Sequence, residues 1–233
     1  MLKYYHATHV GLVRKHNEDS LTIIEPNTFV VADGMGGQAA GEIASQMLVA
    51  TVTDVINSSH EPFDENILKS AILTANEKII AESKQNKERE GMGTTATILH
   101  VSNHTAYYAH VGDSRLYKLE SNILNQITQD HSYVQSLVRS GQITQEQANV
   151  HPMKNILTQA VGGMHDLSVD CGNFPVHSGD VFLLCTDGLS NMLSDQEITL
   201  ILQSSHNPAG DLIEAALNHG GKDNISVIIV GLL

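Results

Sequence analysis

The sequence contains only two cysteines among its 233 residues and has no long hydrophobic run. Cys171 and Cys185 are not part of a C-x-x-C pair, so neither a disulfide framework nor a thiolate zinc site is expected. No stretch approaches the roughly 18 consecutive apolar residues of a transmembrane helix, and residues 1–5 contain no apolar signal segment. These absences predict a soluble, cytoplasmic protein that does not enter a membrane.

Basic residues are also scarce. Thirteen lysines and arginines stand against 26 aspartates and glutamates, which gives a net charge of −13. This excess of acid argues against a nucleic acid or an anionic membrane as the partner. Hydrophobic residues make up 41% of the chain and charged residues 17%, a composition typical of a folded globular protein.

Short runs rich in β-branched and aromatic residues predict strands at intervals along the chain. They cover residues 21–24, 28–32, 94–101, 105–111, 115–119, 122–128, 181–185 and 225–230. The runs occur in groups, with helical patterns bunched between them, instead of alternating one strand with one helix. This order predicts an α+β fold in which one sheet packs on another and helices lie outside.

Helices are predicted where apolar residues recur at the i, i+3, i+4 spacing. Residues 40–56 and 68–79 each show one such stripe, which indicates two long helices with a buried face. Ser194 and Glu197 form a capping-box pattern that begins a short helix, and residues 208–218 form another.

Segment 132–160 differs from the rest because it is polar and helical but has few large apolar anchors. Thr144 and Gln147 form a further capping pattern within it. We interpret this segment as a flap subdomain lying over the main body. The length allows one large domain or two small ones, but no composition shift marks a linker, so residues 1–233 are expected to form a single domain.

Five of the predicted strands carry an aspartate at one end, several of them beside a glycine that permits a sharp turn. A single Asp-Gly is an ordinary turn signal, but packed antiparallel strands can bring five such ends together. Crowded carboxylates repel one another, and hard divalent cations such as Mg²⁺ or Mn²⁺ remove that repulsion. The sequence therefore predicts a metal site formed by Asp19, Asp33, Asp113, Asp187 and Asp223.

The motifs around these aspartates follow one another in the order of a known family. They are Gly11-Leu12-Val13-Arg14 with Asn17-Glu18-Asp19, Val31-Ala32-Asp33-Gly34-Met35-Gly36-Gly37, Gly93-Thr94-Thr95-Ala96, Val111-Gly112-Asp113-Ser114-Arg115, Thr186-Asp187-Gly188-Leu189 and Asp223-Asn224-Ile225. This series resembles the PPM (PP2C-type) protein phosphatases, specifically their compact bacterial branch. Each motif alone is a weak signal, whereas the ordered series spans residues 11–230 and is highly specific.

The resemblance implies a four-layer αββα sandwich, in which helix pairs flank two antiparallel sheets and a small helical flap adjoins a binuclear Mn²⁺ or Mg²⁺ site. It implies that Asp33 bridges the two ions and that the Gly34 carbonyl contacts one of them. Asp187 and Asp223 would complete the shell of one ion, and Asp19 would act on the other, partly through water.

A third ion is implied as well, because bacterial relatives carry one beside the flap and Asp113 with Asp187 matches its ligands. Arg14 matches the arginine that binds the substrate phosphate, and a planar guanidinium suits phosphate oxygens. The implied reaction is hydrolysis of phosphoserine and phosphothreonine in proteins by a water that bridges the ions, without a covalent phosphoenzyme. An opposing serine/threonine kinase is an implied partner, and a monomer is expected.

Three positions depart from the family pattern. Eukaryotic members tend to carry histidine, a candidate general acid for the leaving alkoxide, where this sequence has Met35. Bacterial members often carry histidine at the position of Gln38. Without these histidines, protonation of the leaving group by a metal-bound water is expected. Gln159 stands where bacterial relatives often have arginine, a change that bears on substrate preference.

Two alternatives stay open from the sequence. Residues 30–32 lead into Gly34-x-Gly36-x-x-Ala39 and a helix, which satisfies the dinucleotide-binding fingerprint of an oxidoreductase. Against it, Asp33 would bring a carboxylate toward a pyrophosphate, and Asp54 lies inside a predicted helix instead of ending a second strand. The other alternative is a non-catalytic phosphopeptide-binding module of the same fold, which would bind without releasing phosphate.

Overall fold

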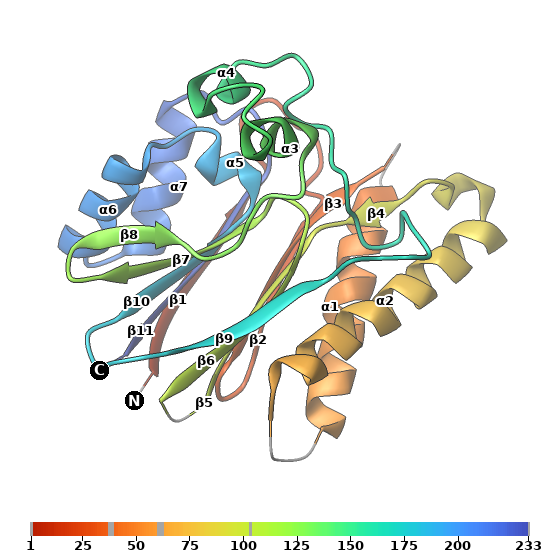
Figure 1. Ribbon diagram of the computed structural model, residues 1–233, viewed down its shortest axis with the longest axis horizontal. Coiled ribbons are helices and arrows are strands. Elements are labelled where there is room, and N and C mark those ends of the chain that lie inside the picture. Colours follow the sequence, from red (N-terminus) through yellow and green to blue (C-terminus); the bar gives the residue numbers. More distant parts are fainter. Residues whose placement is uncertain (1, 37–39, 60–62, 103, 233) are drawn as a thin grey trace.

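The computed structural model describes residues 2–36, 40–59, 63–102 and 104–232. Two antiparallel sheets stack face to face, and helices cover the outer side of each sheet (Figure 1). This order of helix, sheet, sheet and helix confirms the α+β sandwich predicted from the grouping of strands and helices.

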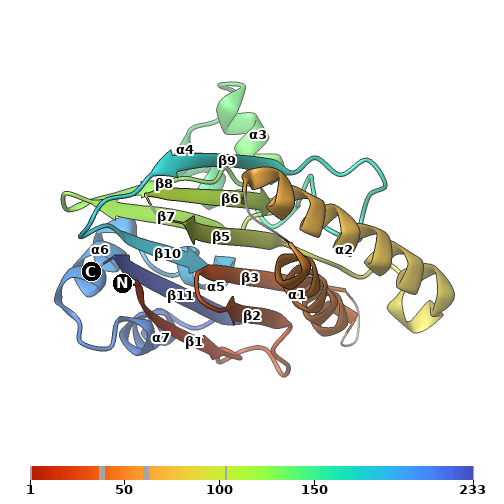
Figure 2. The same ribbon diagram turned by 90° about the horizontal axis from the view of Figure 1, so that it is seen from below.

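One sheet has five strands in the order β1–β11–β10–β7–β8. Strand β1 was absent from the predictions because it is an edge strand whose residues are all exposed or half-buried, so its sequence shows no buried stripe. Its antiparallel partner is the last strand of the chain, which brings the two ends of the described chain side by side (Figure 2). The bounds are β1 Leu2–His9, β7 Arg115–Glu120, β8 Ile123–Gln126, β10 Val181–Cys185 and β11 Ile225–Leu232.

The other sheet follows the order β2–β3–β5–β6–β9, and β4 pairs with the end of β3. Strand β9 has no predicted counterpart, because it too is an edge strand without a buried residue. The predicted strand 94–101 was wrong in one respect, since it is interrupted at Thr95, whose N–H donates to the Asp33 carbonyl over 2.9 Å. The bounds are β2 Asp19–Ile24, β3 Thr28–Met35, β4 Gly93–Thr94, β5 Ala96–Ser102, β6 Thr105–Val111 and β9 Asp170–Pro175.

Each sheet has a helix pair on its outer side. Helices α1 (Ala40–Ser58) and α2 (Glu65–Gln85) pack on the sheet that contains β3, and a short 3₁₀ helix, Lys87–Arg89, follows them. On the opposite side, α6 (Asp195–Ser204) and α7 (Pro208–Asn218) cover the sheet that contains β11. The predicted capping box of Ser194 and Glu197 is present at the start of α6.

The predicted flap segment contains two short helices, α3 (Tyr133–Arg139) and α4 (Gln145–Asn149). The capping box of Thr144 and Gln147 is confirmed at the start of α4. Both helices lie beyond one end of the sandwich in Figure 1. Among the described helices, none combines the length and the apolar character that crossing a bilayer requires.

The alternation of side chains along β3 explains how the sandwich positions charged groups at its end. Val30 and Ala32 face the layer of α1 and α2, whereas Phe29 and Val31 face the other sheet. Because side chains on a strand alternate between its faces, Asp33 continues the row that points between the two sheets. The apolar layer between the sheets therefore ends at a carboxylate.

Candidate metal centre

The candidate site begins with a pair of aspartates on neighbouring strands. In the antiparallel register of β2 and β3, Asp19 lies opposite Asp33 at the end of the sheet. Asp19 is buried, and its Oδ2 accepts hydrogen bonds from Thr186 Oγ1 at 2.9 Å and Ser226 Oγ at 2.7 Å. Ser226 lies in β11 and Thr186 directly follows β10, so Asp19 connects its own sheet to the end of the facing sheet.

Three more strands bring aspartates to the same place. Asp113 follows β6, Asp187 follows β10 as the first residue of the short helix α5 (Asp187–Ser190), and Asp223 precedes β11. These three residues line one cavity of about 480 Å³ together with Asp33. Residues that follow or precede strands of both sheets thus line one cavity, and Asp19 lies opposite Asp33 in the neighbouring strand.

The carboxylates of the site perturb one another. Desolvation, followed by the charges of Asp19 and Asp187, raises the pKa of Asp33 well above its usual range. Desolvation and the charge of Asp187 also raise the pKa of Asp113. Burial raises the pKa of Asp19 to about 7, and burial with the charge of Asp223 raises that of Asp187 to about 6. The protein groups around these carboxylates therefore supply too little positive charge to keep all of them ionised near neutral pH.

The donor set fits hard divalent cations. Among the described residues, Asp19 Oδ1 and Asp187 Oδ1 are buried without a hydrogen-bond partner. Buried carboxylate oxygens normally find a donor or a cation, because desolvating them otherwise costs free energy. Carboxylates and a backbone carbonyl are the ligands that Mg²⁺ and Mn²⁺ prefer, and the described residues that line the cavity include no cysteine that would favour a softer metal.

Gly34 lies on the cavity wall at a point where only glycine fits. A Cβ atom there would lie 2.1 Å from the Gly41 carbonyl oxygen and 2.5 Å from that of Glu18. The missing side chain lets β3, the start of α1 and the segment before β2 approach closely. A substitution at Gly34 would therefore displace the neighbouring Asp33.

Arg14 lies in the loop between β1 and β2 and lines the same cavity. Its Nη2 donates to Asp223 Oδ2 over 2.7 Å, and about half of its side chain is exposed. The guanidinium is thus at the open side of the cavity, within reach of both solvent and the carboxylates.

Asn224 is a site residue to which sequence reasoning assigned no role. Its Oδ1 accepts from the Glu18 N–H at 2.8 Å, and its Nδ2 donates to the carbonyl oxygens of Val10 and His16, both at 2.9 Å. The buried amide therefore holds the loop of Arg14 against the turn that presents Asp223. In the sequence, its position directly after Asp223 was the one feature that could have indicated this role.

Two of the three positions that depart from the family pattern lie in the cavity. Met35 lines the cavity, and its thioether cannot donate a proton. Gln159 also lines the cavity, where its Oε1 accepts from the Ser168 N–H at 3.2 Å. Gln38 lies outside the described residues.

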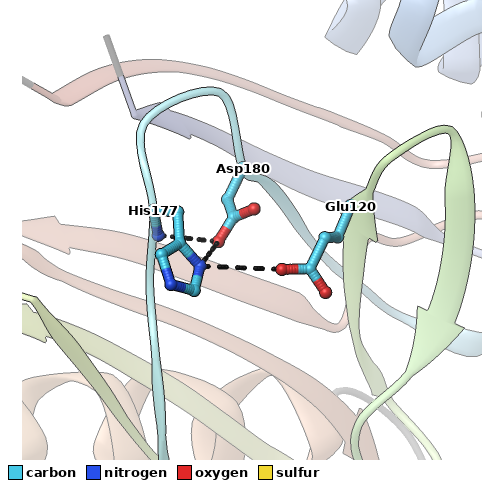
Figure 3. Close-up of side chains that lie close together, drawn as sticks. All are labelled: Glu120, His177 and Asp180. Carbon is cyan, nitrogen blue, oxygen red and sulfur yellow. Dashed lines mark hydrogen bonds and ion pairs between the residues drawn. The ribbon is translucent and has the colours of Figure 1, made fainter.

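A second group of potential ligands lies at the opposite end of β7 and β10 (Figure 3). His177 Nδ1 is 3.6 Å from Glu120 Oε1 and 3.8 Å from Asp180 Oδ2. However, the Lys118 ammonium lies 2.9 Å from each of these carboxylates and 3.5 Å from the Pro175 carbonyl oxygen. A lysine already supplies the positive charge here, so we interpret this group as an ion-pair network.

The geometry does not support a dinucleotide-binding fold. Strand β3 pairs antiparallel with both β2 and β5, whereas a dinucleotide fingerprint requires a parallel βαβ unit. Asp54 lies within α1 and does not end a strand. Ala39, the last residue of the fingerprint, is outside the described residues.

Comparison with known proteins settles the family. A sequence profile described as Protein phosphatase 2C matches residues 13–224, a range that contains all five predicted aspartates. The chain belongs to the protein phosphatase 2C family. This membership confirms the resemblance drawn from the ordered motifs.

Relatives of this phosphatase 2C chain include the serine/threonine phosphatase stp of Listeria monocytogenes serotype 4b (strain F2365), which is 38% identical over 231 residues, 94% of this chain and 92% of the relative. The crystal structure of the Mycobacterium tuberculosis serine/threonine phosphatase PstP/Ppp matches with a TM-score of 0.93 and 38% identity over 99% of this chain and 98% of that chain. The catalytic domain of PstP in complex with two manganese ions matches with a TM-score of 0.91 and 37% identity over 99% and 97% of the two chains. The chain is a metal-dependent serine/threonine protein phosphatase, and neither alternative class finds support.

Proposed function

We propose that the carboxylate cavity is the active site, where phosphoserine and phosphothreonine of protein substrates are hydrolysed directly by water. The observation that supports this most strongly is the convergence of Asp19, Asp33, Asp113, Asp187 and Asp223, two of which have buried oxygens without a hydrogen-bond partner. Bound Mn²⁺ or Mg²⁺ supplies an activated water and neutralises charge on the phosphoryl oxygens.

Two ions would be held by residues of both sheets. Asp33 would contact both ions, with the Gly34 carbonyl on one of them. Asp187 and Asp223 would complete the shell of one ion, and Asp19 would act on the other, partly through water. A third ion would be held by Asp113 and Asp187 beside the flap.

Arg14 would bind the substrate phosphate. Its guanidinium reaches Asp223 from the open side of the cavity, so phosphate oxygens entering there meet a planar donor group. Met35 cannot protonate the leaving alkoxide, and we assign that proton to water in the cavity.

We further propose that residues 1–233 act as one phosphatase domain with the flap at about 132–160. A monomer in the cytoplasm, opposed by a serine/threonine protein kinase, is the simplest cellular setting. The two cysteines are both free, as is usual for a protein of a reducing compartment.

A metal titration of the purified chain tests the proposed function. Phosphate release from a phosphothreonine peptide and from p-nitrophenyl phosphate should rise with added Mn²⁺ or Mg²⁺ and stop with chelator. Turnover that persists in chelator would contradict the metal-dependent reaction. Saturable peptide binding without phosphate release would support the non-catalytic module instead.

A further inference from the structure

The cavity has two chemically different walls. The carboxylates and Arg14 form one side, whereas Met35, Leu157, Ala160 and Met164 supply apolar side chains to the same cavity. Met164 is 42% exposed, and the other three are half-buried. We call these four residues the apolar wall. Apolar side chains that line a cavity beside a few polar groups are a common feature of ligand-binding sites.

The apolar wall is built on hydrogen-bonded backbone. Met35, at the end of β3, lies opposite Gly93 of β4. Thr94 of β4 in turn exchanges two 2.9 Å backbone hydrogen bonds with Val161, the residue after Ala160. The two halves of the wall, more than 120 positions apart in the chain, are therefore joined through one short strand.

The segment that carries Met164 is anchored independently to α2. The buried Asn76 side chain donates to the Met164 carbonyl over 2.8 Å and accepts from the Gly162 N–H at 2.7 Å. Gly162 has a φ of +90°, and a Cβ atom there would lie 2.3 Å from Ile79 Cγ2. The backbone beneath Met164 is thus fixed before any substrate arrives, which lowers the entropic cost of binding.

The size of the cavity exceeds what the reacting group needs. A phosphate group occupies the space of a few water molecules, each of roughly 30 Å³. The cavity measures about 480 Å³, which is within the range of sites that enclose a small ligand. A substrate with its phosphate against the carboxylates therefore brings neighbouring atoms against the apolar wall.

We propose that the apolar wall binds an apolar side chain adjacent to the phosphorylated residue of the substrate, so that the enzyme prefers phosphosites flanked by large aliphatic residues. This inference rests on the proposed function, because it places the phosphate at the carboxylates. Two of the four wall residues are methionines, whose flexible thioethers adapt to side chains of different shape. A polar neighbour in the substrate would lose water without gaining a hydrogen bond from these side chains.

Two phosphothreonine peptides of equal length and charge test the preference. One has leucine on both sides of the phosphothreonine, and the other has asparagine, which is of similar size but polar. With Mn²⁺ present, kcat/KM should be about ten-fold higher for the leucine peptide, as for a modest hydrophobic contact. In Met164→Gln the ratio should fall to about two-fold or less, because the wall becomes partly polar.

Met153→Gln is the matched control. Met153 is 41% exposed, close to the value for Met164, but it belongs to the flap and is not among the residues that line the cavity. This variant should keep the wild-type ratio, and both variants should keep the wild-type melting temperature and Mn²⁺ affinity. A wild-type ratio near one, an unchanged ratio in Met164→Gln, or an equal loss in both variants would overturn the inference. No phosphate release from either peptide would contradict the proposed function itself.

Discussion

At one end of the sandwich, Arg14 is the only basic residue among the described residues that line the cavity with its four aspartates. The Arg115 guanidinium also opposes the rise in the pKa of Asp113 and Asp187, but it is paired with Asp130 at 2.7 Å. At the other end, Glu120 and Asp180 share the ammonium of Lys118 at 2.9 Å each. Strands β7 and β10 run between these two ends, so the same scaffold carries both acidic groups. The comparison shows that a cluster of acidic residues does not by itself identify a metal site. A metal site is indicated where the protein supplies too little positive charge to balance the cluster.

Burial and hydrogen bonding sharpen the difference. At the cavity end, Asp19 and Asp187 have raised pKa values and buried oxygens without partners. At the far end, Asp180 is buried, but its Oδ2 contacts Lys118 and accepts from the His177 N–H at 2.9 Å. The far end is therefore satisfied by protein groups, whereas the cavity end needs an external cation.

The largest expected effect is on activity, and it distinguishes substitutions at the cavity end from those at the far end. Asp33→Ala should lower kcat on the order of 10³-fold or more, because the residue that we propose as a ligand to both ions is lost. Asp180→Ala, at the far end, should leave kcat within about two-fold of wild type. Assays of phosphate release at saturating Mn²⁺ compare the two variants. Comparable losses in both would abolish the distinction drawn between the ends.

The next largest effect is on the free energy of unfolding, and it concerns the far end. Lys118→Met should lower the free energy of unfolding by about 2–3 kcal/mol, since it leaves the buried Asp180 without its cation. Activity should be unchanged. Urea unfolding measures the loss, and adding Glu120→Gln with Asp180→Asn should restore most of it. A Lys118→Met protein as stable as wild type would show that the ion-pair network is not needed.

Arg14 provides the complementary substitution at the cavity end. Arg14→Ala should raise KM for phosphopeptides about ten-fold, by removing a charge-assisted contact to phosphate. Stability should change little, because the side chain is half exposed and its ion pair with Asp223 is screened by solvent. Steady-state kinetics with urea unfolding checks both parts, and an unchanged KM would remove Arg14 from substrate binding.

The last prediction concerns how the stability of the metal-free protein depends on pH. The raised pKa values of Asp19 and Asp187, about 7 and about 6, mean that the folded state holds protons that the unfolded state has released. The free energy of unfolding should then fall as pH rises from about 4 to about 7. Burial lowers the pKa of His110 to about 4, which gives a contribution of opposite sign, but Asp33 and Asp113 add to the carboxylate effect.

Melting temperatures measured in chelator and in saturating Mn²⁺ separate the contribution of the carboxylates from that of His110. Because the His110 contribution is the same with and without metal, it cancels in the difference between the two conditions. The stabilisation by Mn²⁺ should be larger at about pH 7.5 than at about pH 5. Equal stabilisation at both values would mean that the carboxylates do not govern it.

Much of the fold and of the candidate site could be predicted from the sequence, because short local patterns determine those parts. The long helices and the capping boxes of α4 and α6 follow from periodicity and local hydrogen bonding. The aspartates at strand ends were found in the same way. Strands β1 and β9 were missed because edge strands with exposed residues have no strong pattern.

The parts that sequence reasoning missed are long-range contacts. Thr186 and Ser226 bond to Asp19 across 167 and 207 positions, and Asn224 bonds to Glu18 across 206. No local spacing indicates such partners, since they depend on how the two sheets stack. The far-end ion-pair network of Lys118 is hidden for the same reason.

Calorimetric titration of Mn²⁺ into the metal-free protein tests the central claim most directly. The comparison uses wild type, Asp187→Asn at the cavity end and Asp180→Asn at the far end, because both substitutions remove one carboxylate with little change in shape. Wild type and Asp180→Asn should bind the same number of Mn²⁺ ions with the same affinity, whereas Asp187→Asn should lose tight binding. Tight binding that survives in Asp187→Asn and disappears in Asp180→Asn would contradict the account.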